Sequence, residues 1–169
     1  MFSNPKFLEI IIILFFTILI DQITKSFAYK ELFLTGQIFY INDFLSFTPV
    51  WNNGISFGMF QDFGNYGRFT FTIIAILISV WLIWSSINLQ RLSSIGYILI
   101  AGGALGNATD RIIHGKVIDF IDFHYLDMHW PVFNFADTFI FIGVSLFLYN
   151  EFFLSKAKKK NDYKIIFKF

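Results

Sequence analysis

Cysteine is absent from the 169-residue chain, and charged residues are scarce. Without a thiol, the sequence excludes cysteine catalysis, disulfide bonds, cysteine-ligated zinc and lipidation on cysteine. Only 15% of the residues are charged, whereas a soluble domain usually has roughly a quarter. The net charge of +1 gives no reason to expect nucleic acid as a partner. This composition therefore argues against a soluble globular enzyme.

Hydrophobic residues make up 56% of the chain and are concentrated in long runs. A transmembrane helix needs about 20 mostly apolar residues. Runs of this kind predict spans at about 7–27, 69–90, 92–111 and 132–153. The remaining segments are predicted outer loops at about 28–67 and 112–131 and a basic tail at 154–169. We therefore expect a single-domain, all-α membrane protein built on a bundle of four transmembrane helices.

The first apolar run follows Lys6, as the hydrophobic segment of a cleavable signal peptide would. It is followed by Asp21-Gln22-Ile23-Thr24-Lys25 and not by the small residues of a cleavage site, so we interpret it as a retained anchor. Lys and Arg favour cytoplasmic loops. Most of them fall on the inner side if both termini are cytoplasmic, which is the orientation we predict.

The outer loops contain signs of β-structure. Residues Gln37–Val50 are rich in aromatic and β-branched residues around Asn42-Asp43, which favours a short hairpin lying on the membrane. Residues Lys116–Tyr125 are also expected to be extended. In the third predicted span, Gly102, Gly103 and Gly106 predict close helix packing inside the bundle, in preference to dimerisation.

Polar side chains interrupt the predicted spans at their outer ends. Ionisable groups within spans are costly and usually face a bundle interior or a water-filled cavity. These residues lie at three helix ends and in the loop after the third span: Asp21, Thr24, Lys25, Asn107, Asp110, Arg111, Asp119, Asn134 and Asp137. We therefore expect carboxylates from separate segments to meet near the outer leaflet.

Several of these charges also have a purely structural interpretation. Asp21 and Lys25 are four residues apart, which is the spacing of a helical ion pair. Asp110 beside Arg111 is open to interpretation as a helix-end pair or cap. Asp122 is most simply a solvated loop acid, as is Asp127.

The three histidines, His114, His124 and His129, lack the spacing of a metal site, so the sequence predicts no metal. Asp119 and Asp137 have the strongest claim to a chemical role, because both are set among apolar residues. If they meet, carboxylates this close in a medium of low dielectric hold one proton between them. Such a pair can hydrolyse a peptide without a metal or a covalent intermediate.

Two other functions are compatible with parts of the pattern. A small proton-coupled carrier would use the clustered acids as a relay, but they gather at one face and do not cross the bilayer. A serine protease would use Ser56, within Gly54-Ile55-Ser56-Phe57-Gly58, together with a histidine. The strand-turn-helix context that this G-x-S-x-G pattern requires is not predicted here.

Five short motifs, in order along the chain, resemble those of the lipoprotein signal peptidase (signal peptidase II) family of bacterial membrane aspartyl proteases. They are Asp21-Gln22-Ile23-Thr24-Lys25, Asn52-Asn53-Gly54-Ile55-Ser56-Phe57, Gly102-Gly103-Ala104-Leu105-Gly106-Asn107-Ala108-Thr109-Asp110-Arg111, Gly115-Lys116-Val117-Ile118-Asp119-Phe120 and Phe133-Asn134-Phe135-Ala136-Asp137. Ser56 stands where alanine is usual in the family.

The resemblance implies that Asp119 and Asp137 are the catalytic pair. It also implies a set of residues that bind substrate or support the site: Asp21, Lys25, Asn52, Gly54, Asn107, Asp110, Arg111 and Asn134. The implied fold is a four-helix bundle with a small extracytoplasmic β-cradle and a short interfacial helix. The implied substrate is a prolipoprotein whose cysteine carries diacylglycerol, cut just before that cysteine. We expect no cofactor, contact with membrane lipid, and a monomer in the bacterial inner membrane.

Overall fold

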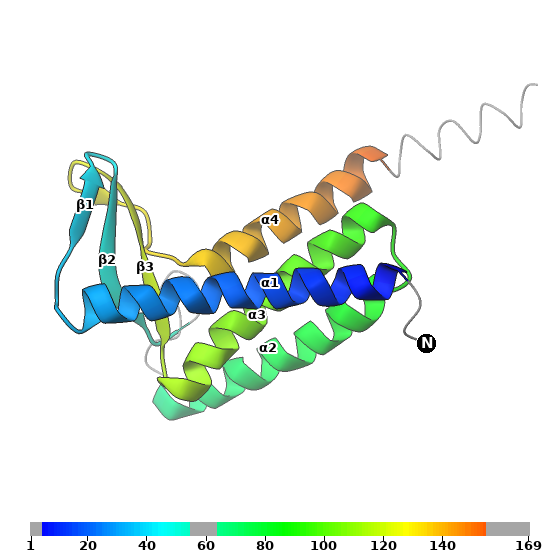
Figure 1. The fold of residues 1–169 in the computed structure, drawn as a ribbon, viewed down its shortest axis with the longest axis horizontal. Coiled ribbons are helices and arrows are strands. Elements are labelled where there is room, and N and C mark those ends of the chain that lie inside the picture. Colours follow the sequence, from blue (N-terminus) through cyan, green and yellow to red (C-terminus); the bar gives the residue numbers. More distant parts are fainter. Residues whose placement is uncertain (1–4, 55–63, 155–169) are drawn as a thin grey trace, which may run out of the picture.

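The computed structural model describes residues 5–54 and 64–154, which form a helical bundle with a small sheet at one end (Figure 1). Ser56 and the basic tail from residue 155 onward lie outside the described residues. The start of the first helix and the end of the last helix lie at the opposite end of the bundle from the sheet (Figure 1).

The bundle consists of four helices, each long and apolar enough to cross a membrane. They are α1 (Pro5–Ala28), α2 (Gly64–Ser86), α3 (Arg91–Ile113) and α4 (Phe135–Tyr149). Short π-helical turns, Tyr29–Phe33 and Asn150–Leu154, extend α1 and α4. The prediction of a four-helix membrane bundle is therefore confirmed.

Several helix ends differ from the sequence prediction, and α2 begins at Gly64 and not at about 69. The second helix stops at Ser86, and the four residues that follow, with Asn88 and Gln90 among them, form the turn into α3. The fourth helix starts at Phe135 and not at 132, because Asn134 is in an extended conformation and caps it. Its side chain accepts a hydrogen bond from the backbone N–H of Asp137, which satisfies one of the free donors of the first turn.

Helix α3 packs against each of the other three helices, and its glycines allow the close approach. A Cβ atom on Gly102 would lie 2.6 Å from Thr17 Cγ2 of α1. A Cβ on Gly106 would collide with the Asp21 carboxylate, and one on Gly103 would collide with the carbonyl oxygen of Ala136. The prediction that these glycines serve packing inside the bundle is confirmed.

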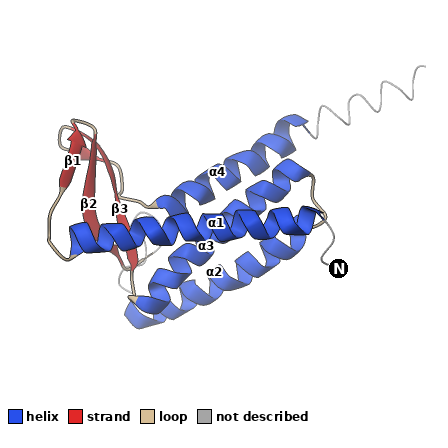
Figure 2. Cartoon of the chain, in the orientation of Figure 1, coloured by secondary structure: helices blue, strands red, loops and turns tan. Residues whose placement is uncertain are grey.

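The sheet has four antiparallel strands in the order β1-β2-β3-β4, and Figure 2 shows β1, β2 and β3 side by side. They are β1 (Phe39–Asn42), β2 (Leu45–Asn52), β3 (Val117–Tyr125) and β4 (Met128–His129). The first two strands form the predicted hairpin, and the third is the segment expected to be extended. The described residues include no separate interfacial helix, and residues 55–63 lie outside them.

The sheet is anchored to the end of α1 by one face of β3. Ile118 and Phe120 form a buried cluster with Ala28 and Leu32. Because successive side chains on a strand point to opposite faces, Asp119 points away from this cluster. The packing of Ile118 and Phe120 against α1 thus fixes the position of Asp119, which lies between them in the sequence.

Candidate active site

Asp119 lies on β3, is 2% exposed, and accepts hydrogen bonds from two asparagines. Asn52 Nδ2 is 2.9 Å from Asp119 Oδ2, and Asn134 Nδ2 is 2.6 Å from Asp119 Oδ1. Asn52 pairs with Val117 across the β2–β3 ladder. Asp119 is two residues after Val117, so the side chains of Asn52 and Asp119 lie on the same face of the sheet. The register of the sheet therefore supplies one of the two donors.

Asp137 lies in the first turn of α4 and completes a capping box with Asn134. Its Oδ2 accepts the backbone N–H of Asn134 at 3.3 Å, while Oδ1 accepts Asn107 Nδ2 at 2.9 Å. The position of this carboxylate is set by the helix cap on one side and by α3 on the other.

Asn134 joins the two acids. Its Oδ1 accepts the backbone N–H of Asp137 at 3.0 Å, so its Nδ2 faces Asp119. The residue is fully buried. The structure thus brings Asp119 of the sheet and Asp137 of the bundle onto opposite sides of a single amide.

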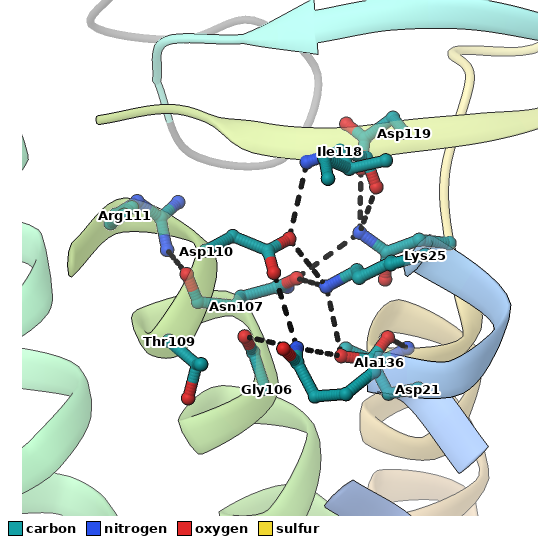
Figure 3. Close-up of polar contacts among 12 residues, drawn as sticks. Asp21, Lys25, Gly106, Asn107, Thr109, Asp110, Arg111, Ile118, Asp119 and Ala136 are labelled. Carbon is teal, nitrogen blue, oxygen red and sulfur yellow. Dashed lines mark hydrogen bonds and ion pairs between the residues drawn. The ribbon is translucent and has the colours of Figure 1, made fainter. Parts of the chain in front are cut away.

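A second cluster of charges surrounds Lys25 (Figure 3). Lys25 Nζ is 2.9 Å from Asp21 Oδ2, 2.8 Å from Asp110 Oδ2 and 2.8 Å from Asn107 Oδ1. Lysine is a donor only, so its contact with the Asn107 oxygen turns the Asn107 amide nitrogen toward Asp137. Lys25, itself 1% exposed, therefore orients a hydrogen-bond donor to one of the paired acids.

The two acids of this cluster also hold the backbone of other elements. Asp21 Oδ1 accepts the N–H of Ala136 on α4 at 2.9 Å, and Asp110 Oδ2 accepts the N–H of Ile118 on β3 at 3.2 Å (Figure 3). Asp110 pairs with Lys25 and not with Arg111, so the helix-end pair considered from the sequence is not formed. The reason is that Asp110 faces α1, where a buried cation needs a counter-charge.

Arg111 is 8% exposed and holds the end of β2. Its guanidinium donates to the carbonyl oxygen of Gly54 at 2.8 Å, and the Gly54 N–H donates to Asn52 Oδ1 at 2.9 Å. Its charge also acts on the carboxylates of Asp137 and Asp119. All ten residues singled out from the sequence are therefore linked to one another by direct contacts.

Burial raises the pKa of Asp119 from 3.8 to about 7, and the charge of nearby Asp137 contributes in the same direction. The hydrogen bonds from Asn52 and Asn134 and the charge of Lys25 oppose this rise. At neutral pH, Asp119 is thus close to half protonated, which suits a group that gives or takes a proton. The neighbours of its oxygens are N–H donors, which cannot ligate a metal.

A cavity of about 230 Å³ lies beside the acids. Asp137 and Asn52 form part of its wall. Asp119 lies behind Asn52, whose side chain donates a hydrogen bond to it. The other lining side chains are mostly apolar, with Phe71 and Ile74 from α2 and Ile140 from α4 among them. An apolar space with a few polar groups at one side is typical of a binding site.

Sequence reasoning missed one contributor to this region and misjudged one residue on the other face of β3. Gln22 Nε2 donates to Asp110 Oδ1 and to Asp21 Oδ2, both at 3.1 Å, and its position beside an acid in the first motif was the available signal. Asp122 was interpreted as a solvated loop acid, and this was wrong. It lies on β3, is 3% exposed, and is near the hydroxyls of Ser46 and Thr48. Alternation along the strand turns it inward.

Buried carboxylates, amide donors and an apolar cavity lie together at one end of a four-helix membrane bundle, an arrangement that suits a hydrolase acting within the membrane. The family model for signal peptidase (SPase) II matches residues 13–153. The chain belongs to the signal peptidase II family and is an aspartic-type signal peptidase of bacterial membranes. The proton-coupled carrier is not favoured.

Individual relatives agree with this assignment. The lipoprotein signal peptidase of Shewanella oneidensis is 40% identical over 163 residues, which cover 93% of this chain and 92% of the relative. That of Burkholderia thailandensis is 42% identical over 137 residues, covering 79% and 81%. A solved structure described as a bacterial membrane enzyme at 2.3 Å resolution has a TM-score of 0.73 at 30% identity, covering 91% of this chain and 90% of that one.

Proposed function

We propose that Asp119 and Asp137 share one proton and together hydrolyse a peptide bond by activating water. The observation that carries the proposal is Asn134, whose amide contacts the side chain of Asp119 and the backbone of Asp137. Acids held this close in a buried place do not both ionise readily. The pKa of about 7 at Asp119 agrees with one proton being retained near neutrality.

The ionised carboxylate takes a proton from water, and the water oxygen forms a bond to the carbonyl carbon of the substrate. The protonated partner donates its hydrogen bond to the carbonyl oxygen, on which negative charge develops. When the tetrahedral intermediate collapses, the C–N bond breaks and the departing nitrogen receives a proton from the pair. The residues end with one shared proton, ready for another cycle.

The substrate we propose is a prolipoprotein whose cysteine already carries diacylglycerol, cut on the amino side of that cysteine. Two relatives of this chain are named lipoprotein signal peptidases, which supports the choice. The apolar cavity between α2, α3 and α4 suits a substrate that arrives through the bilayer with acyl chains attached.

The surrounding residues have supporting roles in this proposal. Asn52, Asn107 and Arg111 line the cavity, and their amide and guanidinium groups suit the backbone of an extended peptide. Asp21, Lys25 and Asp110 hold the helix ends in place. Gly54 and Asn134 position the donors.

We further propose that the sheet faces the outer side of the bacterial inner membrane, with both termini in the cytoplasm. The described chain begins and ends at the bundle end away from the sheet, which is consistent with an even number of crossings (Figure 1). The active site then lies near the outer leaflet. We propose that the protein acts as a monomer in contact with membrane lipid.

The test is cleavage of a lipid-modified precursor by Asp119→Asn and Asp137→Asn, assayed separately in membranes. Each change preserves shape but removes the exchangeable proton, so the rate should fall by about 10²- to 10⁴-fold. Asp127→Asn changes an exposed acid in the β3–β4 turn and should leave the rate unchanged. Normal precursor processing by either of the first two variants would exclude the paired-acid mechanism.

A further inference from the structure

One face of the β3–β4 hairpin carries three potential metal ligands. Asp122 and His124 are two residues apart on β3 and so point to the same face. His129 pairs with His124 across the hairpin, and their rings stack with centroids 5.2 Å apart. The spacing in the sequence gave no sign of a metal site, because the turn between the strands brings His129 back to the other two residues.

We propose that Asp122, His124 and His129 bind a divalent transition-metal ion of the zinc type. Their ligand atoms all lie within 4.8 Å of one another. In tetrahedral zinc sites, ligand atoms are about 3.4 Å apart, so a shift of roughly 1 Å would close the set around an ion. Imidazole and carboxylate are ligands that such an ion prefers, and three protein ligands leave one position for water.

The carboxylate of this set is already fixed in place. Asp122 is 3% exposed, and its Oδ2 lies 3.3 Å from Ser46 Oγ and 3.4 Å from Thr48 Oγ1. His129 Nδ1 lies 2.9 Å from Asp122 Oδ1 and 3.0 Å from Oδ2. The hydroxyls on β2 thus support the acid from one side, while the more exposed imidazoles have room to close on the ion from the other.

A hydrogen bond between Asp122 and His129 would also explain part of this arrangement. In that case only His129 would matter, and His124 would be a neighbour that stacks on it. A metal ion requires both imidazoles. His124 therefore distinguishes the two explanations.

The proposed ion has a structural role and takes no part in peptide hydrolysis. It would tie β4 to β3 and, through the hydroxyls of Ser46 and Thr48, to β2. Asp119 is on the same strand three residues before Asp122, but on the other face. Metal binding is therefore expected to stabilise the sheet that carries Asp119, without contact between the ion and the paired acids.

The test is calorimetric titration of the full-length, untagged, detergent-solubilised protein with ZnCl2 after treatment with EDTA. We expect one ion per chain in the wild-type protein. His124→Ala and His129→Ala should each weaken binding at least ~10-fold, because each removes a ligand and not merely an outer support. His114→Ala is the matched control, since His114 lies at the end of α3 against Tyr29 and Trp51 and should leave binding unchanged.

Copper(II) provides a second readout that does not depend on fold stability. The electron paramagnetic resonance spectrum of the Cu²⁺-loaded protein should show coupling to two imidazole nitrogens, and to one in either single variant. Wild-type Zn²⁺ affinity in His124→Ala, or an equal loss in His114→Ala, would overturn the proposal. Both readouts are independent of precursor cleavage, so failure here leaves the proposed hydrolytic function untouched.

Discussion

The hydrogen bond from Asn52 to Asp119 offers a direct test of how the site sets its working pH. Asn52 Nδ2 donates to Asp119 Oδ2 at 2.9 Å, which favours the ionised carboxylate. Asn52→Ala removes this donor while the burial that raises the pKa of Asp119 to about 7 persists. The pKa of Asp119 should therefore rise further.

The size of the rise follows from the energy of the lost contact. A hydrogen bond to a charged group contributes about 1.5–3 kcal/mol, and one pKa unit corresponds to about 1.4 kcal/mol. Asn52 is partly exposed and lines the cavity, so water replaces some of what is lost. We expect the lower end of this range, a rise of about 1 unit.

The assay is the initial rate of precursor cleavage in detergent or liposomes, measured from pH 5 to pH 9. The shared proton is lost on the alkaline side, so that limb of the profile should move from about pH 7 to about pH 8. Asn88→Ala, at the exposed turn between α2 and α3, is the control and should not move it. An alkaline limb that stays in place, or moves to lower pH, would refute this account of the site.

Two further predictions concern stability, measured by thermal unfolding in detergent. Lys25→Met should lower the free energy of unfolding by about 3–5 kcal/mol, because it leaves the buried carboxylates of Asp21 and Asp110 without their cation. The same change at exposed Lys30 should lower it by under about 1 kcal/mol. Equal losses in the two variants would contradict the role given to the cluster. Asp119→Asn should make stability less dependent on pH. With its folded pKa raised to about 7, wild-type Asp119 contributes stability that is complete below about pH 4 and is lost as the pH rises through 7. An unchanged pH dependence in the variant would argue against the raised pKa.

The membrane bundle could be predicted from the sequence because apolar run length reports directly on the bilayer. The start of α4 could not be placed in this way, since Asn134 and its capping geometry lie inside the same apolar stretch. The β1–β2 hairpin was also predictable, because Asn42-Asp43 is a local turn signal. Local signals were sufficient wherever the structure depends on residues close in sequence.

The site was predictable as a set of residues, but not as a set of contacts. Spacing indicated that Asp21 pairs with Lys25, and it does. Spacing could not indicate that Lys25 also binds Asp110, which is far away in the sequence and depends on how α1 packs against α3. Asp122 was misjudged for the same reason, since its burial depends on Ser46 across the sheet.

The buried charge cluster at the ends of α1 and α3 nearest the sheet has a consequence for how the polypeptide enters the bilayer. Asp21 and Lys25 belong to the first membrane span, whereas Asp110 belongs to the third. Each span therefore carries charges that are costly in hydrocarbon until the two spans pack together. Until the third helix is in place, the first helix has the pairing of Lys25 with Asp21 but lacks the pairing of Lys25 with Asp110. We therefore expect the first and third helices to associate early in the insertion of this chain into the membrane.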